Sequence, residues 1–109
     1  MGKTRDRNGV RMDLRAVVYR HHKWWIAHCL ELDLVAEGTT PENAIRDLIE
    51  ISISQVEAAT KIGNLESIFR AAPPEFWAMF SRAGDVPPIK KKLASRSIER
   101  FEAREAVLV

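Results

Sequence analysis

The sequence predicts an α+β domain in which a small antiparallel sheet is covered by one long amphipathic helix. Two runs, residues 12–20 and 24–32, alternate their apolar residues with the period of two that strands show. A run with helical spacing follows from Pro41 onward, after a glycine and a polar stretch. The chain has 109 residues, of which 46% are hydrophobic, and this is enough for one domain with one core.

The first two predicted strands carry the apolar pattern of a sheet interior. In residues 12–20, one face holds alternate apolar side chains, namely Met12, Leu14, Ala16 and Val18. In residues 24–32, both faces are largely apolar, which predicts a strand in the middle of the sheet. Residues 33–38 form a short third strand. The expected sheet is therefore a three-stranded antiparallel meander.

The stretch AEGTTPENAI, residues 36–45, marks the change from sheet to helix. Gly38 is expected to supply backbone freedom at the end of the third strand. Thr40 is expected to cap the helix with its hydroxyl, and Pro41 to take the first helical position. Gly63 is expected to end the helix. The stripe that the helix would bury consists of Ile45, Leu48, Ile49, Val56 and Ala59.

Two shorter elements are expected after the long helix. Pro74 begins a second helix whose apolar face is made by Phe76, Met79, Phe80 and Ala83. Two prolines and three lysines over residues 87–92 predict a solvated connection. The alternation of Phe101, Ala103, Val107 and Val109 predicts a C-terminal strand over residues 98–109, while the Glu, Ala and Arg content of this segment favours a helix.

The expected organisation is a flexible N-terminus over residues 1–11 and a single domain over residues 12–109. Within the domain, residues 12–62 form a β-β-β-α core and residues 63–109 a C-terminal extension.

The formal net charge of +2 is too small to predict a nucleic-acid partner by itself. Cys29 is the single cysteine, and no apolar run has the length of a membrane span or a signal peptide. We expect a cytoplasmic protein without a membrane segment.

The region from Lys23 to Ala59 resembles the HicB antitoxin family. Members of this family share an aromatic strand, a Glu-Leu turn and a Gly-x-Thr-Pro-Glu-x-Ala helix start. The matching positions in this chain are Trp25 to Ala27, Glu31, Leu32, Gly38, Thr40, Pro41, Glu42 and Ala44. Together with the strand before it, the similarity covers residues 12–59, which is about half of the chain.

The resemblance implies a partial RNase H-like fold, in which three antiparallel strands are followed by a helix and a further strand. It also implies an antitoxin, which neutralises a HicA-like, messenger-RNA-cleaving toxin by covering the active surface of that toxin. Family members commonly add a DNA-binding module, either helix-turn-helix or ribbon-helix-helix. The residues after Ile62 offer only one short helix and a charged strand, which is too little for such a module.

No catalytic or metal site can be assembled from the sequence pattern. A metal-dependent nuclease needs converging carboxylates, and the nearest candidates are Asp13, Glu31 and Asp33. Asp13 points away from the helix, whereas Glu31 and Asp33 lie at the end of a strand. A zinc site from His21, His22, His28 and Cys29 lacks the paired spacing of a tetrahedral set. We therefore predict no catalytic residue, no cofactor and no metal.

The function predicted from the sequence is binding of a protein partner without chemistry, and the resemblance implies a HicA-like toxin as that partner. A small sheet with an open edge gains from pairing, and Ile51 and Ile62 lie off the buried stripe, so we expect a homodimer or higher oligomer. Interface anchors tend to be Trp, Tyr or Arg, and the candidates here are Tyr19, Trp24 and Trp77.

An alternative function is that of a stand-alone domain derived from the RNase H-like fold that binds nucleic acid weakly. The basic residues for this role are in the C-terminal segment, namely Lys90, Lys91, Lys92 and Arg96. Glu99, Glu102 and Glu105 follow among the arginines and oppose their charge, so a solvated charged face is the simpler interpretation.

Overall fold

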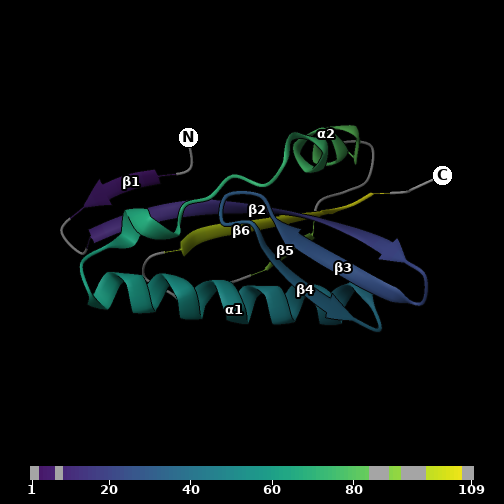
Figure 1. Cartoon of the computed structure of the whole chain (residues 1–109), viewed down its shortest axis with the longest axis horizontal. Coiled ribbons are helices and arrows are strands. Elements are labelled where there is room, and N and C mark those ends of the chain that lie inside the picture. Colours follow the sequence, from purple (N-terminus) through teal and green to yellow (C-terminus); the bar gives the residue numbers. More distant parts are fainter. Residues whose placement is uncertain (1–2, 7–8, 84–88, 92–97, 107–109) are drawn as a thin grey trace.

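Helix α1 (Pro41–Lys61) and helix α2 (Pro74–Arg82) lie on opposite faces of one mixed β-sheet (Figure 1). The computed structural model describes residues 3–6, 9–83, 89–91 and 98–106. A short 3-10 helix, η1 (Leu65–Ile68), follows α1. The strands are β1 (Lys3–Asp6), β2 (Gly9–His21), β3 (Trp24–Cys29), β4 (Leu34–Gly38), β5 (Ile89–Lys91) and β6 (Ile98–Glu105). The fold is therefore α+β, as the sequence predicted.

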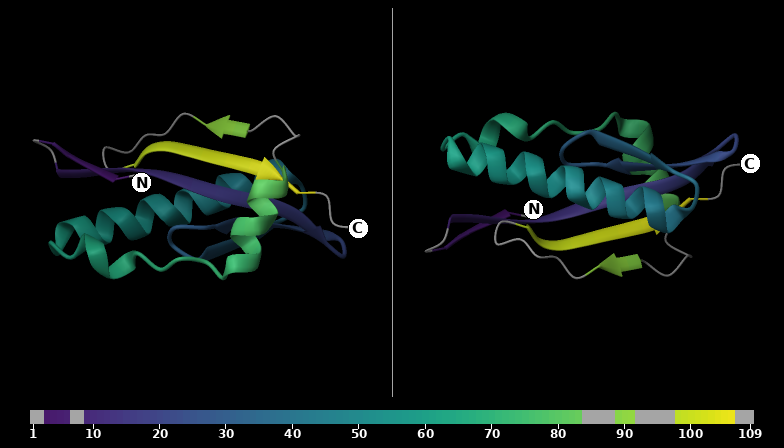
Figure 2. Two further views of the ribbon diagram at one scale, coloured as in Figure 1. Left: turned by 90° about the horizontal axis from the view of Figure 1, so that it is seen from above. Right: turned by 90° about the horizontal axis from the view of Figure 1, so that it is seen from below.

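The sheet has the strand order β4-β3-β2-β6-β5, and β1 pairs with β2. Strands β2, β3 and β4 form the predicted antiparallel meander. Strand β6 lies parallel to β2, and β5 is antiparallel to β6 (Figure 2). A chain segment that comes after both helices thus occupies the interior of the sheet, next to the first strand of the meander.

The larger core lies between the sheet and α1. The alternation predicted for the first strand is confirmed, because its four predicted residues are buried in this core. On α1, the side chains of Ile45, Leu48, Val56 and Ala59 are buried, and Ile49 is partly buried, so the predicted stripe faces the sheet. Strand β6 contributes Ile98, Phe101 and Ala103.

A shift of register in the β2–β6 pairing explains how Ile98 joins this core. Met12 lies opposite Ile98, whereas the next residue, Asp13, lies opposite Arg100. One extra residue in β6 therefore turns both Ile98 and Phe101 toward α1, although they are three positions apart in the sequence. Simple alternation cannot predict this arrangement.

A second, smaller core lies on the opposite face, between β2 and α2. It contains Val17, Leu30, Ala72, Phe80, Ala83 and Ala106, and Phe76, Trp77 and Met79 pack against it. The predicted second helix begins at Pro74 as expected, and its predicted apolar face packs on the sheet. The two helices therefore bury both faces of the central strand β2.

Gly38 is required by a close approach of two elements. A Cβ atom at Gly38 would lie 2.6 Å from the backbone nitrogen of Ala44 and 3.0 Å from the Cβ of Asn43. The φ angle of Gly38 is not positive, so the backbone freedom predicted from the sequence is not the reason for glycine here. The expected cap is confirmed, because Thr40 Oγ1 accepts a hydrogen bond of 3.1 Å from the Asn43 backbone N–H.

Three segments differ from the predicted organisation. Residues 3–6 and 9–11 are strand residues, where the sequence predicted a flexible N-terminus, because β1 supplies backbone partners to the start of β2. Residues 89–91 are a strand rather than part of a solvated connection, because they pair with β6. Residues 98–105 are an internal strand of the sheet rather than part of an extension added to a finished core.

Candidate interaction surfaces

The face of the sheet that carries α2 holds two of the predicted anchors, Tyr19 and Trp77, and both are half-buried. Tyr19 lies 6.2 Å from the Phe76 ring in a stacked arrangement, and burial raises the pKa of its hydroxyl. Trp77 Nε1 donates a 3.1 Å hydrogen bond to the Ala72 carbonyl, and Arg15 lies over its ring at 5.0 Å. These two aromatic side chains hold α2 on the sheet.

Glu31, in the turn after β3, connects β2 to the segment that precedes α2. Its two carboxylate oxygens each accept a 2.7 Å hydrogen bond, one from the Arg15 backbone N–H and one from Arg15 Nε. Its carbonyl accepts a bond from the Arg70 N–H, and the Leu30 carbonyl accepts one from the Ala72 N–H. The extended segment before α2 is thereby fixed to the same turn that ends β3.

His28 and Asp33 form a second, separate pair. His28 is buried, and its Nε2 lies 2.6 Å from Asp33 Oδ1. The His28 ring packs 4.2 Å from the Phe76 ring of α2. Asp33 has a φ of 53°, a left-handed conformation that aspartate tolerates better than most residues. The pair therefore joins the β3–β4 turn to the packing of α2.

The acidic residues considered for a nuclease site do not act together. Glu31 bonds Arg15 and Asp33 bonds His28, so each carboxylate has its own partner. Asp13 lies on the face away from α1, as predicted, and one of its carboxylate oxygens is buried without a hydrogen-bond partner among the described residues. Within residues 3–6, 9–83, 89–91 and 98–106, no group of three His, Cys, Asp or Glu side chains is placed to hold a metal ion.

Cys29 is a core residue with an unreactive thiol. Burial is the main cause that raises the pKa of the Cys29 thiol, to about 12, and the Glu31 carboxylate adds to the effect. The buried Ser52 hydroxyl, which has no other partner in the described part of the chain, lies against this thiol. Because a thiol needs a lowered pKa to act as a nucleophile, this environment opposes nucleophilic chemistry at Cys29.

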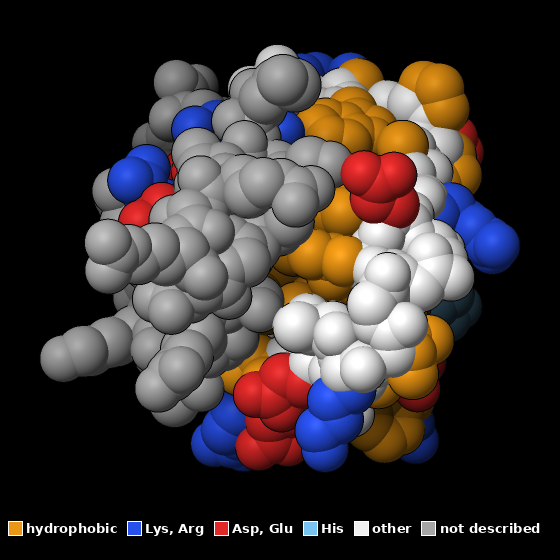
Figure 3. All heavy atoms as spheres, turned by 90° about the vertical axis from the view of Figure 1, so that its left-hand side faces the viewer, with side chains coloured by type: hydrophobic (Ala, Val, Ile, Leu, Met, Phe, Trp, Pro, Cys, Tyr) orange, Lys and Arg blue, Asp and Glu red, His pale blue; other side chains and the backbone are white. Residues whose placement is uncertain are grey.

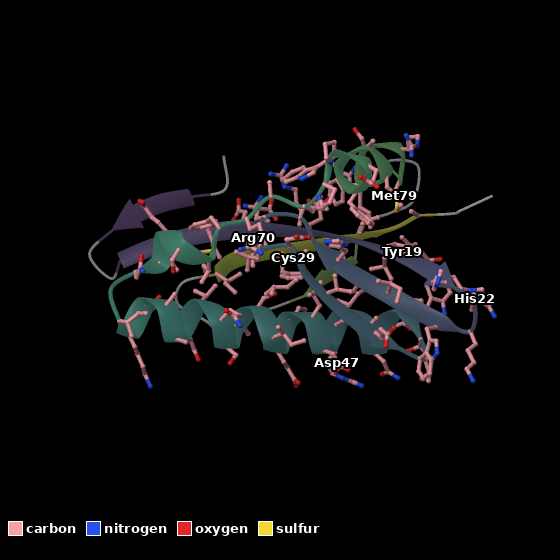
Figure 4. All side chains as sticks on the ribbon, in the orientation of Figure 1. Tyr19, His22, Cys29, Asp47, Arg70 and Met79 are labelled. Carbon is pink, nitrogen blue, oxygen red and sulfur yellow. The ribbon has the colours of Figure 1, made fainter. Side chains whose placement is uncertain are left out.

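The exposed residues of α1 include four acids and two bases, Arg46 and Lys61, so its outer face is acidic on balance and partly apolar. Asp47 points away from the sheet (Figure 4), and Glu50 and Glu57 are also exposed. Ile51 is 38% exposed and Ile62, at the end of the helix, is 75% exposed. Figure 3 views the end of the molecule at which α1 finishes and shows hydrophobic side chains at the surface among charged ones. The second apolar flank that the sequence predicted is therefore open to solvent in the single chain.

The third predicted anchor, Trp24, lies at the start of β3 and is 40% exposed. It follows the turn between β2 and β3, where Arg20, His21, His22 and Lys23 are all exposed. The structure thus places Trp24 beside basic residues at one end of the sheet. Among the three predicted anchors, only Trp24 presents much of its ring to solvent.

The basic C-terminal residues are only partly described. Lys90 and Lys91 belong to β5, of which the structure gives the backbone pairing with β6. Lys92 and Arg96 lie outside the described residues. Further along β6, Arg104 bonds Glu102 at 3.2 Å and lies 4.4 Å from the centre of the Phe80 ring, so this arginine packs against α2.

In the described part of the chain, no helix is both long and apolar enough to cross a membrane. No family model matches the chain, and no curated protein and no solved structure matches it either.

Proposed function

We propose that this chain is a non-catalytic, HicB-like binding domain with a partial RNase H-like fold, and that its partner is a HicA-like toxin. The order of the elements supports the family part of the proposal. Three antiparallel strands, β2 to β4, are followed by α1 and then by a further strand, β6, in the same sheet. The resemblance implies this order of elements.

The packing of the helix start also supports it. In the Gly-x-Thr-Pro-Glu-x-Ala motif, the structure brings the first and last residues, Gly38 and Ala44, into direct backbone contact. Thr40 caps the helix and Pro41 opens it. The spacing of the motif therefore has a physical cause, which is the tight approach of β4 to the first turn of α1.

The observation that carries the functional part is the outer face of α1. A toxin that cleaves messenger RNA needs cations on the surface that binds the phosphates. Exposed carboxylates at Asp47, Glu50 and Glu57, beside exposed Ile51 and Ile62, are complementary to such a surface. Docking of α1 against these cations would cover the RNA site of the toxin without any chemical step.

The test uses the reading frame next to this one on the same transcript. A short, basic product that arrests growth when it is expressed alone, and that no longer does so when this chain is co-expressed, is the expected result. An Asp47→Lys/Glu50→Lys variant should lose the rescue and the binding in a pull-down of the purified pair, because the charges then repel. A Glu37→Lys/Glu75→Lys variant makes the same change of charge away from α1 and should rescue normally.

A neighbouring product that is harmless and does not bind this chain would overturn the toxin assignment, as would the lack of any such frame. Rescue by the Asp47→Lys/Glu50→Lys variant at full strength would overturn the placement of the interface on α1.

We also propose self-association through the open edge of the sheet. Strand β4 ends the strand order on one side, and its Val35 side chain is 49% exposed. An unpaired edge with an apolar side chain favours pairing with a second copy. Sedimentation velocity should show a dimer for the natural chain and a monomer for Val35→Lys. A monomer for both at high concentration would contradict the proposal.

A further inference from the structure

The turn between β2 and β3 carries a compact group of basic and aromatic side chains. We name Arg20, His21, His22, Lys23 and Trp24 the basic tip. All five are exposed, and they lie at the end of the sheet opposite to the end of α1 (Figure 4, which labels His22). The molecule is 44 Å long, and the C-terminal end of α1 lies at its other end (Figure 1). The start of α1 lies nearer to the basic tip, because Gly38, three residues before Pro41, pairs with Trp25.

The sequence around the basic tip is free of carboxylates. No Asp or Glu occurs between Asp13 and Glu31, whereas this span contains three cations and all three histidines of the chain. Arg15, the third cation, is neutralised by Glu31. On the neighbouring strand, the carboxylate nearest the tip in the register is Glu37, which lies opposite Ile26. On the other side of β2, Glu105 of β6 lies opposite Val18, and Glu42 lies in the first turn of α1 just after β4. Among the described residues, none of these three carboxylates forms an ion pair with Arg20 or Lys23.

The side chains of the basic tip are partly ordered by one another. Arg20 Nε donates a 3.0 Å hydrogen bond to the His22 carbonyl, which holds the guanidinium group at the turn. The His21 and His22 rings meet edge to face at 4.4 Å. Lys23 Nζ lies 5.9 Å from the centre of the Trp24 ring. Neither Arg20 nor Lys23 forms a salt bridge with a carboxylate of the described residues.

His22 lies at the turn with a φ of 57°, in the left-handed region. Glycine adopts this conformation without steric cost, and histidine enters it more often than most other residues that carry a side chain. The turn therefore presents an exposed ring beside that of His21, where a glycine would present none.

We propose that the basic tip binds single-stranded nucleic acid. Arg20 and Lys23 would contact phosphates, and the exposed Trp24 ring would stack on an unpaired base. A duplex hides the faces of its bases, so the Trp24 contact selects a single strand. The inference does not depend on the proposed antitoxin role, because it uses other residues than the outer face of α1. It also differs from the predicted basic segment around Lys90.

The experiment measures fluorescence anisotropy of labelled oligouridine and oligothymidine of about 12 nucleotides, a length suited to one small domain. Binding is followed from about 50 mM to 200 mM salt, because phosphate contacts make affinity fall with salt. For the natural chain we expect binding that weakens steeply over this range. Thermal unfolding of each variant checks that the fold is kept.

Three variants locate the site. Arg20→Ala/Lys23→Ala should lower the slope of log affinity against log salt by about 1.4, which corresponds to two phosphate contacts on a single strand. Trp24→Ala should weaken binding roughly ten-fold with little change in the slope, because it removes stacking. Lys61→Ala/Arg70→Ala removes the same charge away from the basic tip and should bind like the natural chain.

Tight binding of either oligonucleotide with these variant effects supports the proposal, and the two arms then tell whether RNA or DNA is preferred. Lack of binding by the natural chain at about 50 mM salt would overturn the proposal. An equal loss in both double variants would overturn it as well, because the affinity would then follow net charge alone. A labelled duplex of the same length is measured alongside, and equal affinity for it, insensitive to Trp24→Ala, would overturn the selection of a single strand by stacking.

Discussion

At Gly38, a single methyl group would collide with the backbone of the next element. A Cβ atom there would lie 2.6 Å from the Ala44 nitrogen, which belongs to the first turn of α1 and cannot rotate away as a side chain can. We expect Gly38→Ala to lower the free energy of unfolding by about 1–3 kcal/mol, as overpacking does. Urea unfolding followed by circular dichroism measures this change.

The neighbouring Glu37 is exposed, so Glu37→Ala serves as the control and should change stability by less than about 0.5 kcal/mol. A Gly38→Ala variant as stable as the control would show that β4 and α1 can separate freely at this point.

At His22, in contrast to Gly38, a substitution is expected to raise the stability of the fold. The φ of 57° at His22 brings the Cβ atom close to the following carbonyl oxygen, a contact that glycine lacks, so His22→Gly should raise the free energy of unfolding by about 1 kcal/mol. Chemical unfolding of the two proteins at one pH compares them. The exposed neighbour His21, replaced by glycine, should destabilise instead because it is a strand residue without this strain. A loss of stability in His22→Gly would contradict the assignment of strain to the turn.

Cys29 links stability to alkaline pH. Burial raises the pKa of its thiol from 9.0 to about 12, so the folded chain holds the proton that the unfolded chain releases. The contribution is complete below pH 9.0 and is lost as pH rises toward about 12. Between pH 8 and pH 10, the natural chain should lose about 1.4 kcal/mol more than Cys29→Ala, as urea unfolding at both values would show. Identical pH dependence in the two proteins would contradict a buried, protonated thiol.

At the scale of elements, α2 is attached less firmly than α1. Phe80 is its one buried residue, whereas α1 buries six along its length. Phe80→Ala should therefore release α2 and speed the amide exchange of residues 74–82, with a loss of about 3 kcal/mol in local stability. Hydrogen exchange with mass spectrometry measures this directly. Residues 41–61 should keep their protection, and equal deprotection of both helices would show that they unfold as one unit.

The elements that could be predicted from the sequence are those with a local apolar pattern. The meander, α1, α2 and the strand at residues 98–105 each repeat apolar residues at their own period. The cap at Thr40 and the left-handed Gly63, which follows the C-cap Ile62, mark the limits of α1. Strands β1 and β5 escaped prediction because they are polar and short, and only their backbone pairing makes them strands. The contact between His28 and Asp33 was missed because it depends on the left-handed turn residue.

The candidate surfaces could be predicted from the sequence only in part. Tyr19 and Trp77 are aromatic residues of the type found at interfaces, but both are half-buried where α2 packs on the sheet. This packing depends on tertiary structure and cannot be predicted from a local pattern. Trp24 was predicted as an anchor, but the sequence analysis did not connect it with Arg20 and Lys23. The structure shows that the turn brings these cations to the same tip as the Trp24 ring. The open flank of α1 was visible in the spacing of Ile51 and Ile62 and is confirmed as exposed.

At the scale of the whole molecule, stability depends on the parallel pair β2–β6. Phe101 of β6 is buried in the main core between the sheet and α1. Phe101→Ala should lower the free energy of unfolding by about 3–5 kcal/mol, which is a large part of the total for a small domain. Its exposed neighbour Arg100, replaced by alanine, should have little effect. Tryptophan fluorescence and circular dichroism should report one coincident unfolding transition. A loss of less than about 1 kcal/mol in the free energy of unfolding of Phe101→Ala would contradict the central role of β6.

The position of β6 has a consequence for synthesis on the ribosome. The first strand of the meander emerges early, but the neighbour that completes one of its edges is translated only after both helices. Until then the nascent chain has an uncovered edge in what will be the middle of its sheet, where unrelated strands are able to pair. Slow elongation, or a tether that delays release of β6, should therefore increase aggregation of newly made chains even though the folded domain is stable.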